Sequence, residues 1–232
     1  MKNNTIQHDF ISNDELYKNM KNRVENIISL AIQKRGQAFI ALSGGSTPKP
    51  FFELLSKADL AWENVYITLV DERWVDTQNA DSNEFLIRNH LLQFKASTAK
   101  FIGLKNDKKT AFEGLEYCNN TLQELDDNFD LVILGMGEDG HTASFFPDAQ
   151  ELGLALSSND MCVTITPPKA PYERMTLTLS RLLRSENIFL HIEGKKKMEV
   201  LNEAFKDGSV EQMPIRAFIN KDQNSPLEVF HA

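Results

Sequence analysis

Apolar residues fall into two alternating kinds of segment, amphipathic runs with helical spacing and short runs that are almost wholly apolar. The first amphipathic run follows Ser12 and Glu15, a capping-box pair, and its apolar positions recur at helical spacing as far as Arg35. A wholly apolar run of strand length, Ala38 to Leu42, comes next. This pattern predicts a long helix that packs on a strand of a sheet.

The same alternation continues toward the C-terminus. Further strands are expected at 65–70, 131–134, 161–166, 188–192 and 215–219. Further helices are expected to begin near Pro48, Ser82, Thr110 and Gly194. Residues 176–183 are ambiguous, because TLTL alternates like a strand whereas SRLL has helical spacing. The alternation predicts an α/β fold, a mainly parallel sheet with helices on both faces, and without a repeat or linker we expect one domain over residues 1–232.

The loop after the expected strand 131–134 carries the first candidate catalytic residues. It reads GMGEDGH and contains Asp139 and His141 among glycines that allow a sharp turn out of a strand. Open α/β sheets bind their ligands outside the carboxyl ends of the strands. A single histidine in a glycine turn can also be an ordinary solvated residue, so the functional interpretation depends on a second loop of the same kind.

That second loop is Ser43-Gly44-Gly45-Ser46-Thr47, between the strand 38–42 and the helix that begins near Pro48. Glycines let the backbone approach an anion closely, while the first-turn N–H groups of the helix and the hydroxyls supply hydrogen-bond donors. The loop is not a Walker P-loop, because the GxxxxGK[ST] spacing and its lysine are absent. A glycine turn with a Ser or Thr helix cap is the alternative interpretation.

Three more loops are expected at the same edge of the sheet, and each carries charge. Residues 71–74 contain Asp71 and Arg73, residues 167–174 end in Arg174, and residues 194–197 end in Lys197. The right-handed crossover rule places these strand-end loops beside the two glycine loops. The constellation suits a small phosphorylated substrate.

Composition and charge narrow the class of protein. A formal net charge of −8 argues against a nucleic-acid surface, which needs clustered Lys and Arg. Cys118 and Cys162 have no metal-site spacing and are expected to be reduced core thiols. The N-terminus has no apolar signal region and the chain has no apolar run long enough to span a membrane. We therefore expect a cytoplasmic protein without nucleic-acid or membrane contacts.

At this point the residues resemble the glucosamine-6-phosphate isomerase/6-phosphogluconolactonase family, and its lactonases in particular. The resemblance spans about residues 36 to 220 and rests on four segments: ALSGGSTPKPFFELL, VDERWV followed by DSN, LGMGEDGHTASFFP, and Arg174 with GKKK. It implies a Rossmann-like sheet without a nucleotide, similar to the glucosamine-6-phosphate deaminase and ribose-5-phosphate isomerase folds. It also implies hydrolysis of 6-phospho-D-glucono-1,5-lactone to 6-phosphogluconate in the oxidative pentose phosphate pathway, without metal or organic cofactor.

The resemblance also implies roles for individual residues. His141 would be the general base that activates water, which suits a neutral imidazole near pH 7. Asp139 or Asp71 could orient its ring, and the sequence does not choose between them. Arg73 would line the same pocket, and charge developing on the carbonyl oxygen would be met by loop N–H groups or by Arg73. The substrate's phosphate would be held by Ser43, Gly44, Gly45, Ser46, Thr47, Arg174 and Lys197.

Two other functions compete with the lactonase. The deaminase branch of the same fold places a glutamate shortly after its histidine loop, in an FNEP segment, whereas this chain has Phe145-Phe146-Pro147 there and no acid until Asp148. The other rival is a non-catalytic sugar-phosphate sensor, but the chain has no evident partner domain. Asp76 departs from the lactonase pattern, which often has proline there, without removing a proposed functional group. We expect a monomer or weak homo-oligomer.

Overall fold

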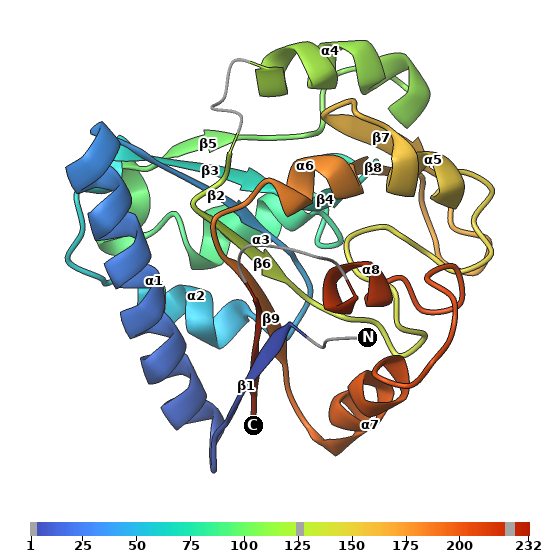
Figure 1. Ribbon diagram of the computed structural model, residues 1–232. Coiled ribbons are helices and arrows are strands. Elements are labelled where there is room, and N and C mark those ends of the chain that lie inside the picture. Colours follow the sequence, from blue (N-terminus) through green and yellow to red (C-terminus); the bar gives the residue numbers. More distant parts are fainter. Residues whose placement is uncertain (1–3, 124–127, 221–225) are drawn as a thin grey trace.

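A seven-stranded sheet forms the centre of the computed structural model, which describes residues 4–123, 128–220 and 226–232 (Figure 1). Every neighbouring pair of its strands is parallel, as the sequence pattern predicted. Across the sheet the strands are β1 (Thr5–Asp9), β10 (Leu227–His231), β9 (Ile188–Ile192), β6 (Leu131–Leu134), β2 (Ala38–Leu42), β3 (Val65–Leu69) and β5 (Lys100–Ile102).

The central strands β2, β6 and β9 are buried along their whole length. Their sequences, AFIAL, LVIL and IFLHI, are nearly continuous apolar runs rather than alternating ones. Continuous runs are typical of parallel strands whose two faces are both covered by helices. The core therefore lies on both sides of this sheet.

Helices cover the sheet in two layers. Helix α1 (Asn13–Arg35) begins at Ser12, whose hydroxyl accepts a hydrogen bond from the Glu15 amide, and ends at Gly36 with a left-handed φ of 80°. It packs against α2, which in turn packs against α3, while α7 and α8 lie on the other side (Figure 1). The remaining helices are α2 (Lys49–Leu55), α3 (Asn83–His90), α4 (Ala111–Gln123), α5 (Leu152–Ser157), α6 (Leu179–Leu183), α7 (Lys195–Ala204) and α8 (Arg216–Ile219), with short 3₁₀ turns at Trp62–Asn64 and Phe94–Thr98.

A small antiparallel sheet stands beside the large one, and the sequence analysis did not predict it. Its strands are β4 (Asp71–Arg73), β8 (Arg174–Leu177) and β7 (Cys162–Ile165), in the order β4-β8-β7. The chain passes from the large sheet to the small one at Val70. The Val70 amide donates to the Leu42 carbonyl of the large sheet, and the Val70 carbonyl accepts from the Leu177 amide of the small sheet. Asp71, Arg73 and Arg174 therefore reach the site from antiparallel strands, not from loops that end parallel strands.

One other expectation about the elements is wrong. Residues 215–219 were expected to form a strand, but Arg216–Ile219 is the short buried helix α8. A short, wholly buried apolar run has no period that separates a strand from a helix. The last strand is instead β10, and it pairs with β1 and β9, so the two ends of the chain meet inside one sheet. The ambiguous segment 176–183 contains both predicted forms, the end of β8 and the whole of α6.

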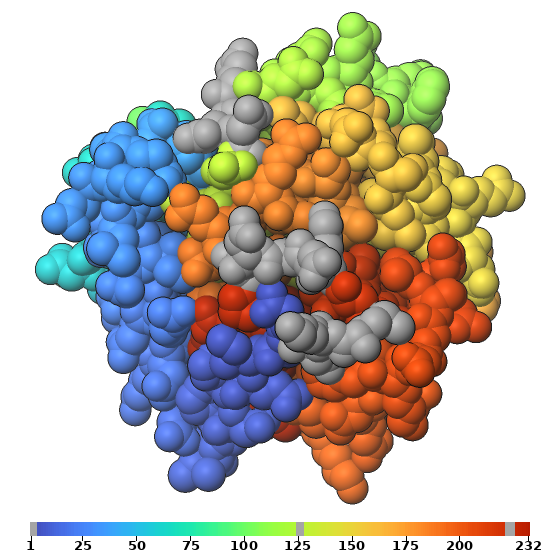
Figure 2. Space-filling model, in the orientation of Figure 1, coloured from blue at the N-terminus to red at the C-terminus, as the bar shows by residue number. Residues whose placement is uncertain are grey.

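The space-filling view shows the consequence of that pairing on one face of the molecule. The N-terminal part of the chain, in blue, lies directly beside the C-terminal part, in orange and red (Figure 2). Cys118 and Cys162 are free and buried, as expected. Among the described residues, no helix is both long and apolar enough to cross a membrane.

Candidate active site

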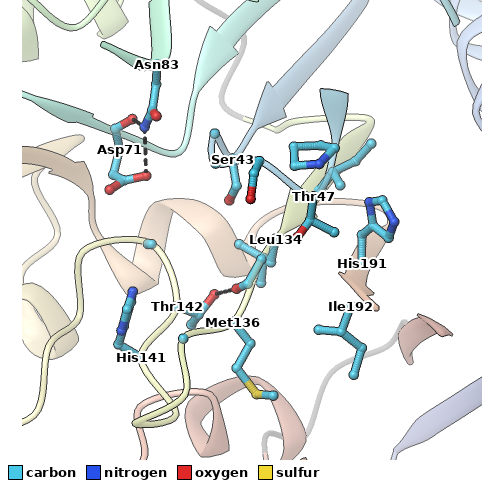
Figure 3. Close-up of a pocket in the computed structure, with 18 of the residues that line it drawn as sticks. Ser43, Thr47, Asp71, Asn83, Leu134, Met136, His141, Thr142, His191 and Ile192 are labelled. Carbon is cyan, nitrogen blue, oxygen red and sulfur yellow. Dashed lines mark hydrogen bonds between the residues drawn. The ribbon is translucent and has the colours of Figure 1, made fainter. Parts of the chain in front are cut away.

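A cavity of about 400 Å³ opens at the carboxyl ends of β2, β6 and β9. Figure 3 shows Asp71 and His141 toward one end of it and Thr47 and His191 toward the other. The predicted site residues that line the cavity are Ser43, Gly44, Gly45, Ser46, Thr47, Asp71, Arg73, His141, Arg174 and Lys197. Loops from the large sheet and strands from the small sheet thus bring the predicted constellation together. Asp139 is not one of the lining residues, but it contacts His141, which is.

His141 and Asp139 form a hydrogen-bonded pair within the loop after β6. The Nδ1 atom of His141 lies 2.5 Å from Oδ1 of Asp139, and a carboxylate can only accept, so Nδ1 is the donor and Nε2 is the atom with a lone pair whenever the ring is neutral. Burial alone would raise the pKa of Asp139, but the hydrogen bonds and charge of His141 lower it to about 2. Gly137 is required here, because a Cβ on it would lie 2.1 Å from Nδ1 of His141.

Phe146 supplies an apolar wall that the sequence analysis did not assign to the site. Its ring centre lies 4.3 Å from that of His141, and the guanidinium carbon of Arg174 lies 5.7 Å from the Phe146 ring. One aromatic side chain therefore supports both the candidate base and a candidate phosphate ligand. An apolar surface at this point strengthens electrostatic interactions by reducing water in the site.

Arg73 and Arg174 face the cavity as neighbours, because they are paired in register across β4 and β8. Arg73 donates from Nη1 to the Asp81 carbonyl at 2.5 Å, and Arg174 donates from Nη2 to the Pro171 carbonyl at 3.1 Å. The Nε atoms of both arginines are buried and have no hydrogen-bond partner among the described residues. Burial also lowers the pKa of Arg174. These guanidinium groups retain donor capacity for an anion.

Lys197 enters the cavity from the first turn of α7. Its ammonium group donates to the Met136 carbonyl at 2.7 Å, and burial lowers its pKa. The neighbouring lysines point away, as expected: the Lys195 side chain is 91% exposed and Lys196 pairs with Glu138 at the surface. Only one of the three consecutive lysines therefore serves the cavity.

The glycine loop after β2 offers polar groups without forming a helix cap. Gly45 has a φ of 100°, a left-handed conformation that favours glycine. Pro48 is the N-cap of α2 and no side chain caps that helix, so the Ser or Thr cap considered above is absent. Ser43 Oγ is buried and has no hydrogen-bond partner within the described part of the chain. The loop hydroxyls are therefore not consumed by local structure.

Asp71 does not contact His141, and this removes one of the two candidates for the orienting carboxylate. Its Oδ2 accepts a hydrogen bond of 2.5 Å from Ser144 Oγ, and its main-chain carbonyl accepts one of 2.8 Å from Asn83 Nδ2. Asn83 lines the cavity, and dashed lines in Figure 3 mark its hydrogen bonds to Asp71. Asn83 belongs to the DSN segment, so its motif was noted but no role was assigned to it.

His191 also lies at the site, because it is buried at the wall of the cavity. Its Nε2 atom donates to Oε1 of Glu193 at 3.0 Å, and its ring stands edge-on to the rings of Tyr17 and Phe51. His191 is the one polar residue near the carboxyl end of an otherwise apolar strand, six positions before Lys197. That position is the sequence signal that could have placed it at the cavity wall.

Fold and site together define an α/β protein with a cavity lined by two arginines and a lysine, and with a histidine–aspartate pair, at the carboxyl edge of a parallel sheet. A family model for glucosamine-6-phosphate isomerases/6-phosphogluconolactonase matches residues 11–227, and the chain belongs to this family.

Relatives and solved structures agree with that membership. The 6-phosphogluconolactonase of Rhizobium meliloti is 39% identical over 227 residues, which cover 97% of each chain. That of Mesorhizobium japonicum is 40% identical over 90% of this chain and 88% of the relative. A crystal structure of a 6-phosphogluconolactonase from Shewanella baltica superposes with a TM-score of 0.96 at 42% identity, over 98% of this chain and 97% of the other. A monomeric glucosamine-6-phosphate deaminase, 17% identical with a TM-score of 0.79, shares the fold.

Proposed function

We propose that this protein hydrolyses 6-phospho-D-glucono-1,5-lactone to 6-phospho-D-gluconate in the oxidative pentose phosphate pathway. The observation that carries the proposal is the His141–Asp139 pair, 2.5 Å apart, in a cavity that also holds two guanidinium groups and a lysine. The relatives named 6-phosphogluconolactonase support the choice of substrate.

The reaction needs a base, and the geometry supports His141 in that role. Nε2 of His141 takes a proton from water while the water oxygen attacks the lactone carbonyl carbon. Asp139 holds the ring through Nδ1 and stabilises the imidazolium that forms. The bond between the carbonyl carbon and the ring oxygen then breaks, and the ring oxygen receives the proton from His141. Arg73 offers charge to the carbonyl oxygen as it becomes negative.

The phosphate is held away from the reacting carbon. Arg174 and Lys197 supply its charged contacts, and the loop of Ser43, Gly44, Gly45, Ser46 and Thr47 supplies hydroxyl and backbone donors. Desolvation of Arg174 and Lys197 strengthens their attraction to a phosphate. This grip orients the lactone and lowers the entropic cost of reaching the transition state.

The deaminase reaction is the second candidate, and one observation weighs against it. That reaction needs an acid to open the sugar ring, and the segment after the histidine loop places Phe145 in the core and Phe146 on the cavity wall. The aromatic pair occupies the place where the deaminase pattern has its acid.

The first experiment is proton release after adding purified protein to freshly generated lactone, with spontaneous opening subtracted and a chelator present. We expect acceleration that is lost in His141→Ala. No acceleration, together with ammonia release from glucosamine 6-phosphate, would replace the lactonase with the deaminase. Ligand binding without either reaction would favour the sensor.

Three broader expectations accompany this proposal: the whole chain acts as one domain, in the cytoplasm, as a monomer or weak homo-oligomer. The free, buried cysteines are compatible with a reducing compartment. Sedimentation of the purified protein at micromolar concentration tests the oligomeric expectation.

A further inference from the structure

Asp71 is a carboxylate at the cavity wall that the His141–Asp139 pair does not use. It is 8% exposed, yet it lines the cavity. Because Asp139 already orients His141, Asp71 must be accounted for by its own contacts. Those contacts come from Ser144 and Asn83, to which no role was assigned from the sequence.

Ser144 connects Asp71 to the loop that carries His141. The serine is fully buried, three residues after His141, and its hydroxyl donates to Oδ2 of Asp71 at 2.5 Å. Its main-chain amide points to Oγ1 of Thr176 on β8, at 3.3 Å. Ser144 therefore holds the loop of the large sheet against the small sheet, and its hydroxyl is directed at one oxygen of Asp71.

Asn83 holds Asp71 from the opposite direction. Its Nδ2 donates to the Asp71 carbonyl at 2.8 Å and reaches the carboxylate Oδ1 at 3.4 Å. Its amide oxygen lies so close to Gly44 that a Cβ there would be 1.9 Å away. Asn83 thus contacts Asp71 and also packs closely against the glycine loop.

The segment that carries Asp71 and Asn83 is itself anchored by a buried acid. The Glu72 carboxylate accepts hydrogen bonds from the amides of Arg73, Asn83 and Glu84 and from the Ser82 hydroxyl, all between 2.6 and 2.9 Å. This acid fixes the start of α3 to β4, so the main chain of Asn83 is held next to Asp71.

We propose that Ser144 and Asn83 are positioning residues that present the Asp71 carboxylate to the cavity as a hydrogen-bond acceptor for a ring hydroxyl of the substrate. Oδ2 accepts from Ser144, whereas Oδ1, in the part of the chain that the structure describes, has only the 3.4 Å contact from Asn83 and keeps lone pairs for a donor. A sugar lactone offers several hydroxyl donors, and a buried carboxylate left without one is strongly disfavoured. Asp71 therefore selects polyhydroxylated lactones, and this inference rests on the proposed function.

A double-mutant cycle tests whether Ser144 acts through Asp71. We expect Ser144→Ala to lower kcat/KM about tenfold, as expected for losing a hydrogen bond to a charged group, and Asp71→Asn to lower it further. Adding Ser144→Ala to Asp71→Asn should lower kcat/KM little further, because the hydrogen bond from Ser144 to the Asp71 carboxylate is already lost. Equal losses in both backgrounds would overturn the proposal.

Substrate selectivity provides the readout that general destabilisation would not change. We expect wild type to discriminate strongly against lactones that lack single ring hydroxyls, and Asp71→Asn and Ser144→Ala to lose that discrimination for the same hydroxyl. Unchanged discrimination in both variants would overturn the acceptor role of Asp71. The variants' rates are compared with their thermal unfolding, so that loss of fold is not read as loss of selectivity.

The matched control is Ser185→Ala, which removes another buried serine hydroxyl, bonded to the Leu182 carbonyl at 2.6 Å, before the start of β9. It should keep wild-type selectivity and rate. If wild type itself shows no lactonase activity, the proposed function fails. If wild type is active but the cycle is additive, only this inference fails.

Discussion

The cavity is shared by two regions that contribute different chemistry. The parallel sheet supplies His141, Asp139, Lys197 and the glycine loop 43–47 from segments that follow the ends of its strands. The small antiparallel sheet supplies Asp71, Arg73 and Arg174 from within its strands. The first region places groups by local turns, which glycine makes possible, whereas the second places them by pairing segments that are distant in the sequence.

The difference suggests a division of work. The proposed base and its orienting acid belong to one loop of the parallel sheet, so their geometry is local and depends little on the other region. The guanidinium groups depend on the register of β4 and β8, which puts Arg73 opposite Arg174. We therefore expect variants of the His141–Asp139 pair to affect kcat, and variants of the phosphate contacts Arg174 and Lys197 to affect substrate binding.

The largest expected effect is that of His141→Ala. Removing a general base should lower kcat by about 10² to 10⁴. Affinity for 6-phosphogluconate, measured by calorimetry, should stay near that of wild type, because the phosphate contacts are elsewhere. Equal loss of rate and affinity would mean that His141 belongs to the binding region.

Arg174→Ala tests the other half of the comparison. A buried guanidinium that contacts phosphate in ground and transition states alike should raise KM about 10- to 100-fold when removed, with little change in kcat. Lys197→Ala should behave similarly. Lys196→Ala is the control. The Lys196 ammonium pairs with Glu138 at the surface, so its removal should leave KM and kcat unchanged. A fall in kcat at constant KM would contradict the proposed division.

Gly44→Ala tests the contact between the two regions. The new methyl group would overlap the Asn83 amide oxygen, and moving that side chain would break its hydrogen bond to Asp71. We expect a loss of about 1–3 kcal/mol in the free energy of unfolding, together with reduced activity. Gly153→Ala in α5 is the control, since no atom lies within 4 Å of its added Cβ. Full activity in Gly44→Ala would show that the contact has room to relax.

The smallest effect concerns the acid stability of the His141–Asp139 pair. The pKa of Asp139 is lowered from 3.8 to about 2, because the contribution of His141 exceeds that of burial. A carboxyl with a lower pKa in the folded state adds stability above its unfolded pKa, and this stability is lost as the pH falls through the folded value. The Asp139 side chain is 51% exposed, so screening keeps the effect small.

Thermal melts of wild type and Asp139→Asn check this expectation. The difference in Tm between them should be fully developed above about pH 4 and should shrink toward about pH 2. A difference that stays constant over this interval would show that Asp139 has no coupled charge interaction with His141.

Local sequence patterns were enough to predict the parts of the molecule that depend on neighbouring residues. Strand Ala38–Leu42 and strand Ile188–Ile192 have the predicted bounds, and the capped start and glycine end of α1 are as expected. The glycine loops were recognisable because sharp turns and close backbone approach need that residue. The family resemblance was likewise carried by local motifs, and the family match agrees with it.

Features that depend on pairing between distant segments could not be predicted from local patterns. Nothing local in Thr5–Asp9 and Leu227–His231 shows that they pair, and a buried run such as residues 215–219 has no period that separates helix from strand. The choice between Asp139 and Asp71 as the partner of His141 was likewise open, because it depends on which carboxylate lies within hydrogen-bond reach. The distance between Asp71 and His141 is set by how the small sheet packs beside the large one.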